Sequence, residues 1–171
     1  MIFVDKSTLS LMLYNAKTWA PVGKTPVRVH QGRWPKVSAI GGITARGRLY
    51  LKVRKGSIRG PQVVAFLKHL QRHIHRRPIR VLWDNGQPHR SKLVRAYLEK
   101  NPRVEVHRFP GYSPERSPEE WVWAHLKKHE RASFAPHDLQ ELKRRVRLAV
   151  VRMGDRPKLL RKLAGSSKLP N

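Results

Sequence analysis

The chain has 171 residues, of which 37 are lysine or arginine and 11 are aspartate or glutamate, so that its formal net charge is +26. This imbalance indicates a polyanionic partner such as nucleic acid, because basic side chains that neutralise phosphates release condensed counterions. Cysteine is absent, which excludes disulfides, thiolate zinc sites and cysteine nucleophiles. No apolar run approaches the roughly 18 residues of a membrane span and no signal-peptide pattern is present, so we expect a cytoplasmic, nucleoid-associated protein with no membrane partner.

Residues 1–55 have the pattern of strands and turns. Apolar or alternating stretches predict strands over residues 2–4, 9–13, 27–30, 37–44 and 49–53. The last two strands flank a short glycine-containing connection at residues 45–48 and therefore predict a hairpin. Gly41 and Gly42 lie inside the strand before that connection and indicate either a bulge or a close approach of another segment to the backbone.

The hydrophobic spacing then changes to that of helices alternating with strands. This spacing predicts helices over residues 61–74, 91–100, 118–131 and 139–153, and short apolar runs predict strands at 79–83 and 104–107. Strands followed by alternating helices and strands indicate an α/β or α+β domain built on a mixed sheet.

The C-terminal end is strongly basic. Residues 143–168 hold ten basic side chains and one acid, Asp155. Two interpretations stay open for this segment: a solvated, partly disordered tail, or a segment that binds phosphates. The apolar period fades beyond Met153, so we expect one domain over residues 1–153 and a basic tail over 154–171.

Three acids stand out because the first 98 residues contain only two, Asp5 and Asp84. Each follows an apolar run, and Glu120 follows Asp84 after 35 intervening residues. Each acid also has an ordinary structural interpretation. Asp5 is compatible with a turn at a strand end, Asp84 starts an Asp-Asn-Gly turn signal, and Glu120 completes a capping box with Ser117.

Taken together, the three acids favour a metal site. Two strand ends and a helix start can converge at one edge of a mixed sheet, where catalytic groups usually lie. Carboxylates that meet there repel one another unless a cation offsets their charge. Mg²⁺ takes carboxylate oxygens and substrate phosphates, and phosphoryl transfer on nucleic acid commonly uses two such ions.

Four segments of the sequence carry a family resemblance. They are residues 3–5 (FVD), 19–26 (WAPVGKTP), 83–91 (WDNGQPHRS) and 109–127, which include FPGYSPE and PEEWVW. In order and spacing they resemble the catalytic domain of bacterial insertion-sequence transposases, in the mariner-like branch of the DDE superfamily. The resemblance covers about residues 1–130 and implies an RNase H-like fold, in which a mixed five-stranded sheet is flanked by helices.

The resemblance also implies roles for the three acids. Asp5 and Asp84 match the two aspartates of the catalytic triad, and Glu120 rather than Glu119 matches the glutamate. The implied cofactor is a pair of Mg²⁺ ions, for which Mn²⁺ can substitute, with Asp5 bridging both ions. The implied reaction is metal-dependent cleavage at a transposon end, followed by attack of the freed 3′-hydroxyl on target DNA. The implied partners are those two DNAs and further copies of the chain.

The sequence departs from the family pattern in three respects. Lys6 follows Asp5 where the family often has glutamate, although strand alternation predicts that Lys6 faces away from Asp5. Arg116 and Ser117 stand where Leu-Asn is common, and serine can cap a helix as asparagine does. Family members usually carry helix-turn-helix modules before the catalytic domain, so we expect an upstream reading frame to supply them. The chain would then act after a frameshift fusion, or be a remnant of a decayed element.

Several further residues are candidates for supporting roles. Asn85 holds either a bound water or the Asp84 carboxylate, or is a plain turn residue, and His89 either contacts a phosphate or is a surface histidine. Trp121 and Trp123 cannot both face one side of a helix, so one of them is expected in the core. The residues that we expect to contact DNA are Lys127, Lys128, Lys143, Arg144 and Arg147.

Two other functions compete with the transposase interpretation. An RNase H-like nuclease or resolvase would share the fold and the ions but would cut without joining strands. A catalytically dead basic fragment that only binds DNA would share the charge alone. The motifs at residues 19–26 and 112–123 argue against the nuclease, and a metal-dependent nicking assay separates the basic fragment from both enzymes.

Overall fold

The computed structural model describes residues 1–10, 21–22, 36–75, 77–84, 86–109, 118–128 and 138–165. Its strands are β1 (Ile2–Ser10), β2 (Lys36–Thr44), β3 (Leu49–Lys55), β4 (Ile79–Trp83) and β5 (Val104–Arg108). Its helices are α1 (Gly60–His73), the short 3-10 helix η1 (Gln87–Arg90), α2 (Lys92–Glu99), α3 (Pro118–Lys128), α4 (Leu139–Gly154) and α5 (Pro157–Gly165). The strand expected at residues 27–30 and the cap expected at Ser117 lie outside the described residues.

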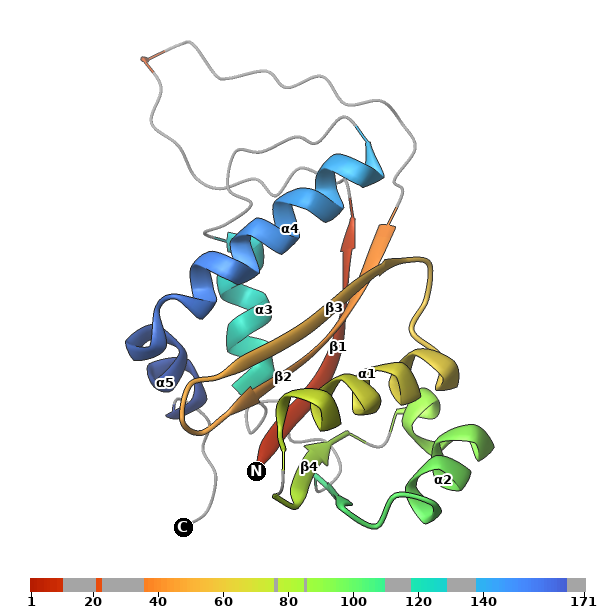
Figure 1. The fold of residues 1–171 in the computed structure, drawn as a ribbon. Coiled ribbons are helices and arrows are strands. Elements are labelled where there is room, and N and C mark those ends of the chain that lie inside the picture. The colour runs from red at the N-terminus through yellow and green to blue at the C-terminus, as the bar shows by residue number, and fades with distance from the viewer. Residues whose placement is uncertain are drawn as a thin grey trace.

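The five strands form one mixed sheet in the order β3-β2-β1-β4-β5. β1 pairs antiparallel with β2, and β2 pairs antiparallel with β3. β1 and β4 pair in parallel, as do β4 and β5, and Figure 1 shows helices on both sides of the sheet. The predicted α/β class and mixed sheet are therefore confirmed.

The prediction that Asp5 closes a strand is wrong. β1 runs without interruption from Ile2 to Ser10, and Asp5 pairs with Gly41 in the middle of the β1–β2 ladder. The apolar run before Asp5 is only the first part of this strand, which continues to the buried Leu9. Asp84, by contrast, follows β4 directly, as predicted.

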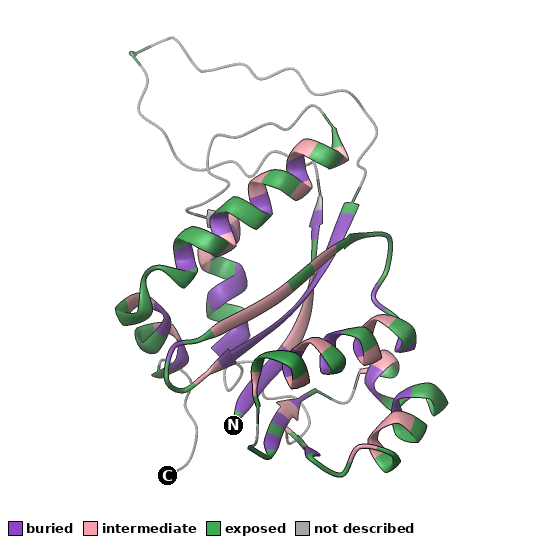
Figure 2. Ribbon diagram, viewed as in Figure 1, coloured by how far each residue is buried: buried purple, intermediate pink, exposed green. Residues whose placement is uncertain are grey.

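The two faces of the sheet are buried under different helices. Alternate residues of β1 divide between two hydrophobic clusters, with Phe3 packed in one and Val4 in the other. The Phe3 cluster holds the buried side chains of α3, α4 and α5, and the Val4 cluster holds those of α1 and α2. β2 lies between these layers and is buried along almost its whole length (Figure 2).

The predicted hairpin is present as β2 and β3. Gly47 has a φ of 77° in the connection, a left-handed conformation that favours glycine. A Cβ atom on Gly41 would lie 3.0 Å from Cη2 of Trp123, and one on Gly42 would lie 2.9 Å from Cγ2 of Ile2. The two glycines of β2 therefore mark a close approach of neighbouring side chains, which was one of the two alternatives.

Helix starts follow their sequence signals where the structure describes them. Ser91 caps α2 by accepting a hydrogen bond from the Val94 backbone, and Asp138 caps α4 by accepting one from Glu141. Pro88 lies in the first turn of the 3-10 helix η1, and α2 begins two residues after η1 ends.

The expected basic tail contains a packed helix. α5 lies within residues 154–171, and its Leu160 and Ala164 belong to the same buried cluster as Phe3. The packed structure therefore continues to at least Gly165, because apolar residues on one face of α5 contact α3 and α4. In the part of the chain that the structure describes, no helix is long and apolar enough to cross a membrane.

Candidate active site

Asp5 lies on β1 and faces α3. The indole Nε1 of Trp123 donates a hydrogen bond of 2.9 Å to Oδ2 of Asp5. Burial raises the pKa of Asp5, and the nearby charge of Asp84 adds to this rise. Hydrogen bonds from the Lys6 backbone and from Trp123 act in the opposite direction, because they stabilise the ionised carboxylate. The pKa of Asp5 nevertheless stays above its ordinary value.

Trp123 can reach Asp5 because β2 carries a glycine at the facing position. Trp123 is 1% exposed, and its ring edge occupies the space where a side chain on Gly41 would stand. Gly41 is also the ladder partner of Asp5. Trp121 is 47% exposed, so the prediction that one of the two tryptophans lies in the core is confirmed for Trp123.

Asp84 is held by the turn that follows it. Nδ1 of His89 lies 2.8 Å from Oδ1 of Asp84, and the Gly86 backbone donates a hydrogen bond of 3.0 Å to the same oxygen. The hydrogen bond from His89 is the main cause that lowers the pKa of Asp84 to about 2, although partial burial opposes it. Asp84 is therefore ionised throughout the physiological range.

His89 is buried, so the alternative of a surface histidine is wrong. Its ring stacks on Trp83 with a centroid separation of 4.4 Å and an interplanar angle of 14°. Nδ1 also lies 3.3 Å from the backbone carbonyl oxygen of Asp84, so it carries the hydrogen that it donates. Among the described residues, none forms a hydrogen bond with the buried Nε2. Asn85 lies outside the described residues.

The two glutamates at the start of α3 have different surroundings. Glu119 is fully buried, and its Oε1 accepts a hydrogen bond of 2.7 Å from the backbone N–H of Ile43 on β2. Glu120 is mostly exposed. Partial burial and the charge of Asp5 raise the pKa of Glu120, whereas Lys127 lowers it. Glu120 thus interacts with Asp5, while Glu119 links α3 to the sheet.

Lys6 brings a positive charge to the acids. Strand alternation sends its side chain away from the Asp5 face, as expected, but its ammonium reaches the turn after β4. Nζ lies 2.7 Å from the position that a Cβ atom of Gly86 would occupy. The charge of Lys6 lowers the pKa of both Asp5 and Asp84. It therefore offsets part of their mutual repulsion.

The sequence did not indicate the neighbours that hold these carboxylates. The Asp5–Trp123 contact joins residues 118 positions apart, and the Ile43–Glu119 contact joins residues 76 apart. The contacts of His89 and Gly86 with Asp84 are local, because they join residues five and two positions apart. In the sequence, such a contact could be inferred only from the position of a histidine five residues after Asp84, in the turn that Asp84 begins.

The donor chemistry of the three acids fits a hard divalent cation. Carboxylate oxygens are the ligands that Mg²⁺ prefers, and the charge of Asp5 interacts with those of both Asp84 and Glu120. Within the described ranges, no three acidic or histidine side chains are close enough together to hold a metal ion as they stand. The predicted convergence of the three carboxylates at one metal site therefore stays a prediction.

The sequence matches the family model of the DDE superfamily endonucleases over residues 1–143. The chain belongs to this family. The comparison with curated proteins gave no match.

Solved structures of the Mos1 mariner transposase have the same fold as this DDE endonuclease. A mariner Mos1 paired-end complex with Mg matches 99% of the chain at 17% identity with a TM-score of 0.70. A Mos1 paired-end complex with the left transposon end matches 98% at 16% identity with a TM-score of 0.64. The Mos1 catalytic domain alone matches 99% at 16% identity with a TM-score of 0.57. The predicted RNase H-like fold is confirmed by these matches.

The chain spans only part of these relatives. It covers 55% and 56% of the Mos1 chains in the two paired-end complexes, but 84% of the chain in the catalytic-domain structure. The matched part therefore corresponds to the catalytic portion of Mos1.

Proposed function

We propose that this DDE endonuclease is the catalytic part of a transposase that cuts and joins DNA strands with the help of Mg²⁺ or Mn²⁺. The observation that carries the proposal is the electrostatic interaction of Asp5 on β1 with both Asp84, directly after β4, and Glu120 on α3. Structures of Mos1 with a transposon end, with Mg and with Mn support DNA and divalent metal as its partners.

In this proposal Asp5, Asp84 and Glu120 hold two divalent ions. The bound ions supply Lewis-acid chemistry, which favours attack by an oxygen nucleophile and stabilises charge on the leaving oxygen. Trp123 orients the Asp5 carboxylate, and His89 orients that of Asp84, because each donates a hydrogen bond to one carboxylate oxygen. Rigid placement of ligands by buried neighbours is what a productive site requires.

The proposed reaction has two steps. Water first forms a bond to the phosphorus at the transposon end, and the 3′ oxygen leaves as a hydroxyl. That 3′-hydroxyl then attacks a phosphodiester of the target, so one bond to phosphorus forms and one breaks in each step. No side chain becomes covalently attached to DNA, which agrees with a site built from carboxylates.

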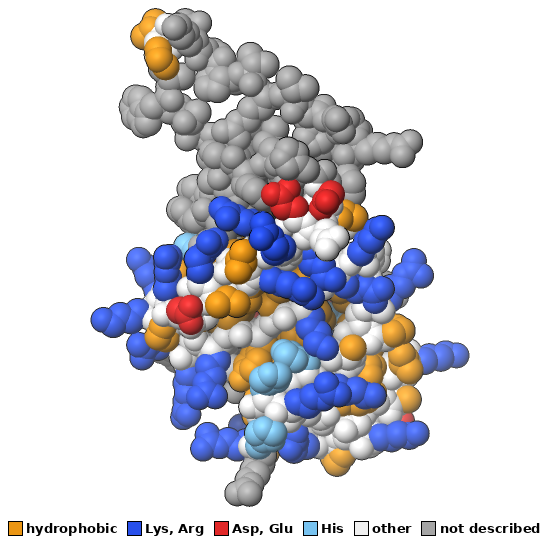
Figure 3. All heavy atoms as spheres, turned by 45° about the horizontal axis from the view of Figure 1, so that its top comes forward, with side chains coloured by type: hydrophobic (Ala, Val, Ile, Leu, Met, Phe, Trp, Pro, Cys, Tyr) orange, Lys and Arg blue, Asp and Glu red, His pale blue; other side chains and the backbone are white. Residues whose placement is uncertain are grey.

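DNA would contact basic residues of α3 and α4. Lys143, Arg144 and Arg147 lie on α4, where together with Lys55 they line a hollow of about 740 Å³ that contains no acid. Lysine and arginine side chains cover much of the face shown in Figure 3. Lys127 and Lys128 at the end of α3 complete the proposed contacts. Phosphate contacts of this kind position DNA without reading its sequence.

The remaining partners belong to the same proposal. The Mos1 chains in the paired-end complexes are longer than this one. We propose that recognition of the transposon ends requires a segment equivalent to the part of Mos1 that this chain does not cover. We therefore propose that the product of a helix-turn-helix reading frame and further copies of the chain join it on DNA. Such an assembly would work at the nucleoid in the cytoplasm.

Substitution of Asp84 tests the proposed reaction. We expect Asp84→Asn to abolish metal-dependent cleavage of transposon-end DNA while DNA affinity changes little, because it alters one charge in a chain whose net charge is +26. Asp155→Asn is the matched control, since Asp155 is an exposed acid at the end of α4 and should leave cleavage unchanged. A strand-joining assay with a 3′-hydroxyl end separates a transposase from a nuclease that only cuts.

Normal cleavage by purified Asp84→Asn would rule out the metal-site assignment. A wild-type chain that binds DNA but neither cuts nor joins it, alone or with the helix-turn-helix product, would instead support the catalytically dead fragment.

A further inference from the structure

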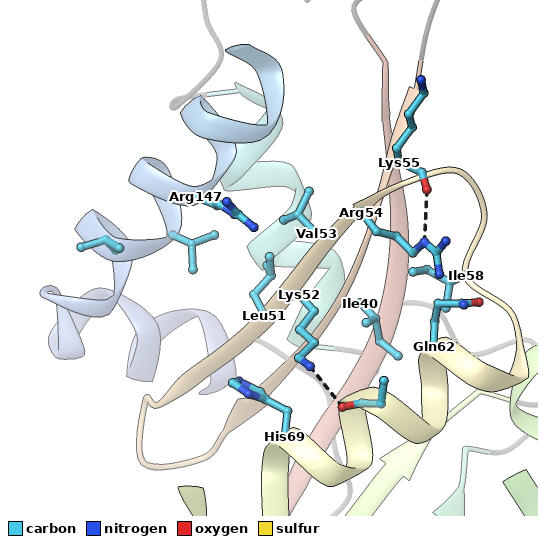
Figure 4. A pocket seen from close by; sticks show the side chains of 13 residues that line it. Ile40, Leu51, Lys52, Val53, Arg54, Lys55, Ile58, Gln62, His69 and Arg147 are labelled. Atoms are coloured by element: carbon cyan, nitrogen blue, oxygen red, sulfur yellow. Dashed lines mark hydrogen bonds between the residues drawn. The ribbon is translucent and has the colours of Figure 1, made fainter. Parts of the chain in front are cut away.

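We propose that the groove along the outer edge of β3 binds an extended, acidic segment of a partner protein, which adds a strand to the sheet. This groove has a volume of about 880 Å³ (Figure 4). It lies at one end of the strand order and is separated from β1 by β2. The inference therefore goes beyond the proposed DNA reaction and does not depend on it.

The groove follows the edge of the strand rather than one face of the sheet. Five consecutive residues of β3, 51–55, line it. Because successive strand residues point to opposite faces, a groove lined by all five has to run along the edge where both faces meet. One helix flanks it on each face, with α1 contributing Gln62, Ala65 and His69 and α4 contributing Arg147, Val150 and Val151.

The edge of β3 offers backbone groups to a further strand. β2 is the only neighbour of β3 among the strands that the structure describes. In an antiparallel pair, every second residue of the outer strand turns its N–H and C=O away from its neighbour. An extended peptide can pair with such groups and place alternate side chains into the flanking hollows.

The floor of the groove is apolar. Leu51 and Val53 of β3 and Val150 and Val151 of α4 contribute to it, and Val151 is 61% exposed. Apolar side chains of an added strand would pack on these residues. A nucleic-acid backbone would gain little there, because its binding energy comes from phosphate neutralisation. The apolar floor therefore favours a polypeptide occupant over DNA.

The rim of the groove is basic. It includes Lys52, Arg54, Lys55 and Arg147 and contains no acidic residue. Nζ of Lys52 donates a hydrogen bond of 3.3 Å to the Ala65 carbonyl, and Nε of Arg54 donates one of 3.1 Å to the Lys55 carbonyl. No acid of the described residues forms an ion pair with Lys52 or Arg54. Each keeps further N–H donors for carboxylates of a partner.

The same charges select against a second copy of this chain. Lysines on an edge strand normally prevent edge-to-edge association, and a second β3 would bring the same cations to the contact. An acidic strand meets no such repulsion. The basic rim therefore both excludes self-pairing and specifies the charge of the partner.

A synthetic nine-residue peptide that alternates glutamate with valine tests the proposal. We expect the labelled peptide to bind the whole chain with increased fluorescence anisotropy, and to shift the backbone amide resonances of residues 51–55. Its control is the same peptide with N-methyl groups on alternate amides, which keeps charge and apolar content but cannot pair as a strand. We expect the control to bind roughly tenfold more weakly or not at all.

Two groove variants and two matched variants outside it locate the binding. Arg54→Glu and Val151→Asp should each weaken the peptide roughly tenfold or more, because the first reverses a rim charge and the second places a charge on the apolar floor. Arg95→Glu and Leu93→Asp are the controls. Both residues are exposed on α2, and Leu93 is 49% exposed. These controls should change peptide affinity by no more than about twofold.

Several outcomes would overturn the inference. If the groove and control variants lose peptide affinity equally, the peptide binds only through the net charge of the chain. Equal binding of the N-methylated peptide would exclude strand addition. If Arg54→Glu and Val151→Asp weaken a short DNA duplex as strongly as the peptide, the groove binds nucleic acid instead. Thermal unfolding of each variant confirms that it is folded, and cleavage assays report separately on the proposed reaction.

Discussion

Asp5 and Asp84 are each oriented by one aromatic neighbour, and the two neighbours affect their acids differently. Trp123 comes from a distant helix and donates to a carboxylate whose pKa burial has already raised. His89 comes from the same turn as Asp84 and is the main cause of its low pKa. Asp84 is thus ionised throughout the physiological range, whereas the raised pKa values of Asp5 and Glu120 would limit the proposed metal binding as the pH falls.

The indole of Trp123 should set the pH at which cleavage is lost. Trp123→Phe keeps an aromatic ring but removes the N–H donor, so the pKa of Asp5 should rise further. Metal binding needs the ionised carboxylate, and a higher pKa means that activity falls at a higher pH on acidification. We expect the acid limb of the pH–rate profile to shift upward by about one unit or less. Trp121→Phe is the control, and an unshifted limb in Trp123→Phe would contradict the assigned role.

The two adjacent glutamates of α3 should separate stability from catalysis. Glu119→Ala leaves the buried N–H of Ile43 without its acceptor, and we expect it to lower the free energy of unfolding by about 1–3 kcal/mol. Glu120→Ala should change that free energy by no more than about 0.5 kcal/mol, because Glu120 is mostly exposed. The same substitution should nevertheless abolish cleavage. Urea unfolding and a cleavage assay on both variants check this. Cleavage that survives in Glu120→Ala would move the assignment to another acid.

At the scale of elements, the local periodicity was enough to place most helices and strands. The strand expected at residues 79–83 is β4, and the glycine-containing hairpin is β2 with β3. Two predictions differ from the structure, because packing between distant segments decides where these two elements lie. β1 continues through Asp5 since β2 pairs with its whole length. α5 is ordered because Leu160 and Ala164 reach the core, which a count of basic residues does not reveal.

The assignment of three acids to the candidate site stays a prediction from the sequence, and the neighbours that hydrogen-bond to Asp5 could not be predicted at all. Asp84 and Glu120 were selected by their position after a strand and at a helix start, which are local features. The contact of Trp123 with Asp5 depends on Gly41, on a third element, and only the folded sheet shows that a side chain there would collide with the indole. Long-range contacts of this kind leave no periodic trace in one sequence.

The hairpin and α5 meet at Gly47, and this contact gives a test of the C-terminal packing. A Cβ atom on Gly47 would lie 2.8 Å from the Pro157 carbonyl oxygen and 2.9 Å from Cγ of Arg161. Its φ of 77° adds strain for any other residue. We expect Gly47→Ala to lower the free energy of unfolding by about 1–3 kcal/mol.

Gly154→Ala is the control for this substitution. Nothing lies within 4 Å of the position that its Cβ would take, at the end of α4. Its stability should be unchanged or higher by up to about 1 kcal/mol, because alanine favours helix over glycine. Thermal unfolding of the two variants side by side measures the difference. Equal stabilities would mean that the contact between the hairpin and α5 contributes nothing.

At the scale of the whole molecule, charge is distributed unevenly. The acids of the candidate site lie on the central strand β1, directly after β4 and on α3, while cations line the β3 edge and α4. This distribution fits the proposal that a polyanion is attracted over a broad surface while a small group of acids holds metal where DNA is cut. Attraction of this kind depends strongly on salt, since each phosphate contact releases a counterion.

DNA binding by this chain alone should be tight at low salt, strongly salt-dependent and nearly independent of sequence. The proposed DNA contacts come from Lys127, Lys128, Lys143, Arg144 and Arg147. A plot of the logarithm of the binding constant against the logarithm of the salt concentration should then have a slope of about −4.5, from five contacts at about 0.9 each. Replacing the three α4 residues with alanine should reduce the slope by about 2.7, from three contacts at the same value. The matched control replaces three exposed cations elsewhere with alanine. They are Arg72 of α1, Arg95 of α2 and Lys100 at the C-cap of α2.

The sequence dependence of binding separates the contributions of this chain and of its proposed partner. Phosphate contacts position a protein, and base-edge contacts specify a site. Competition with terminal-repeat and scrambled duplexes across a salt series should therefore show no preference for the repeat. Fusion to the proposed helix-turn-helix reading frame should restore that preference. If the isolated chain already prefers the repeat a hundredfold, about 2.7 kcal/mol, end recognition lies within these 171 residues, and the partner reading frame is not needed for it.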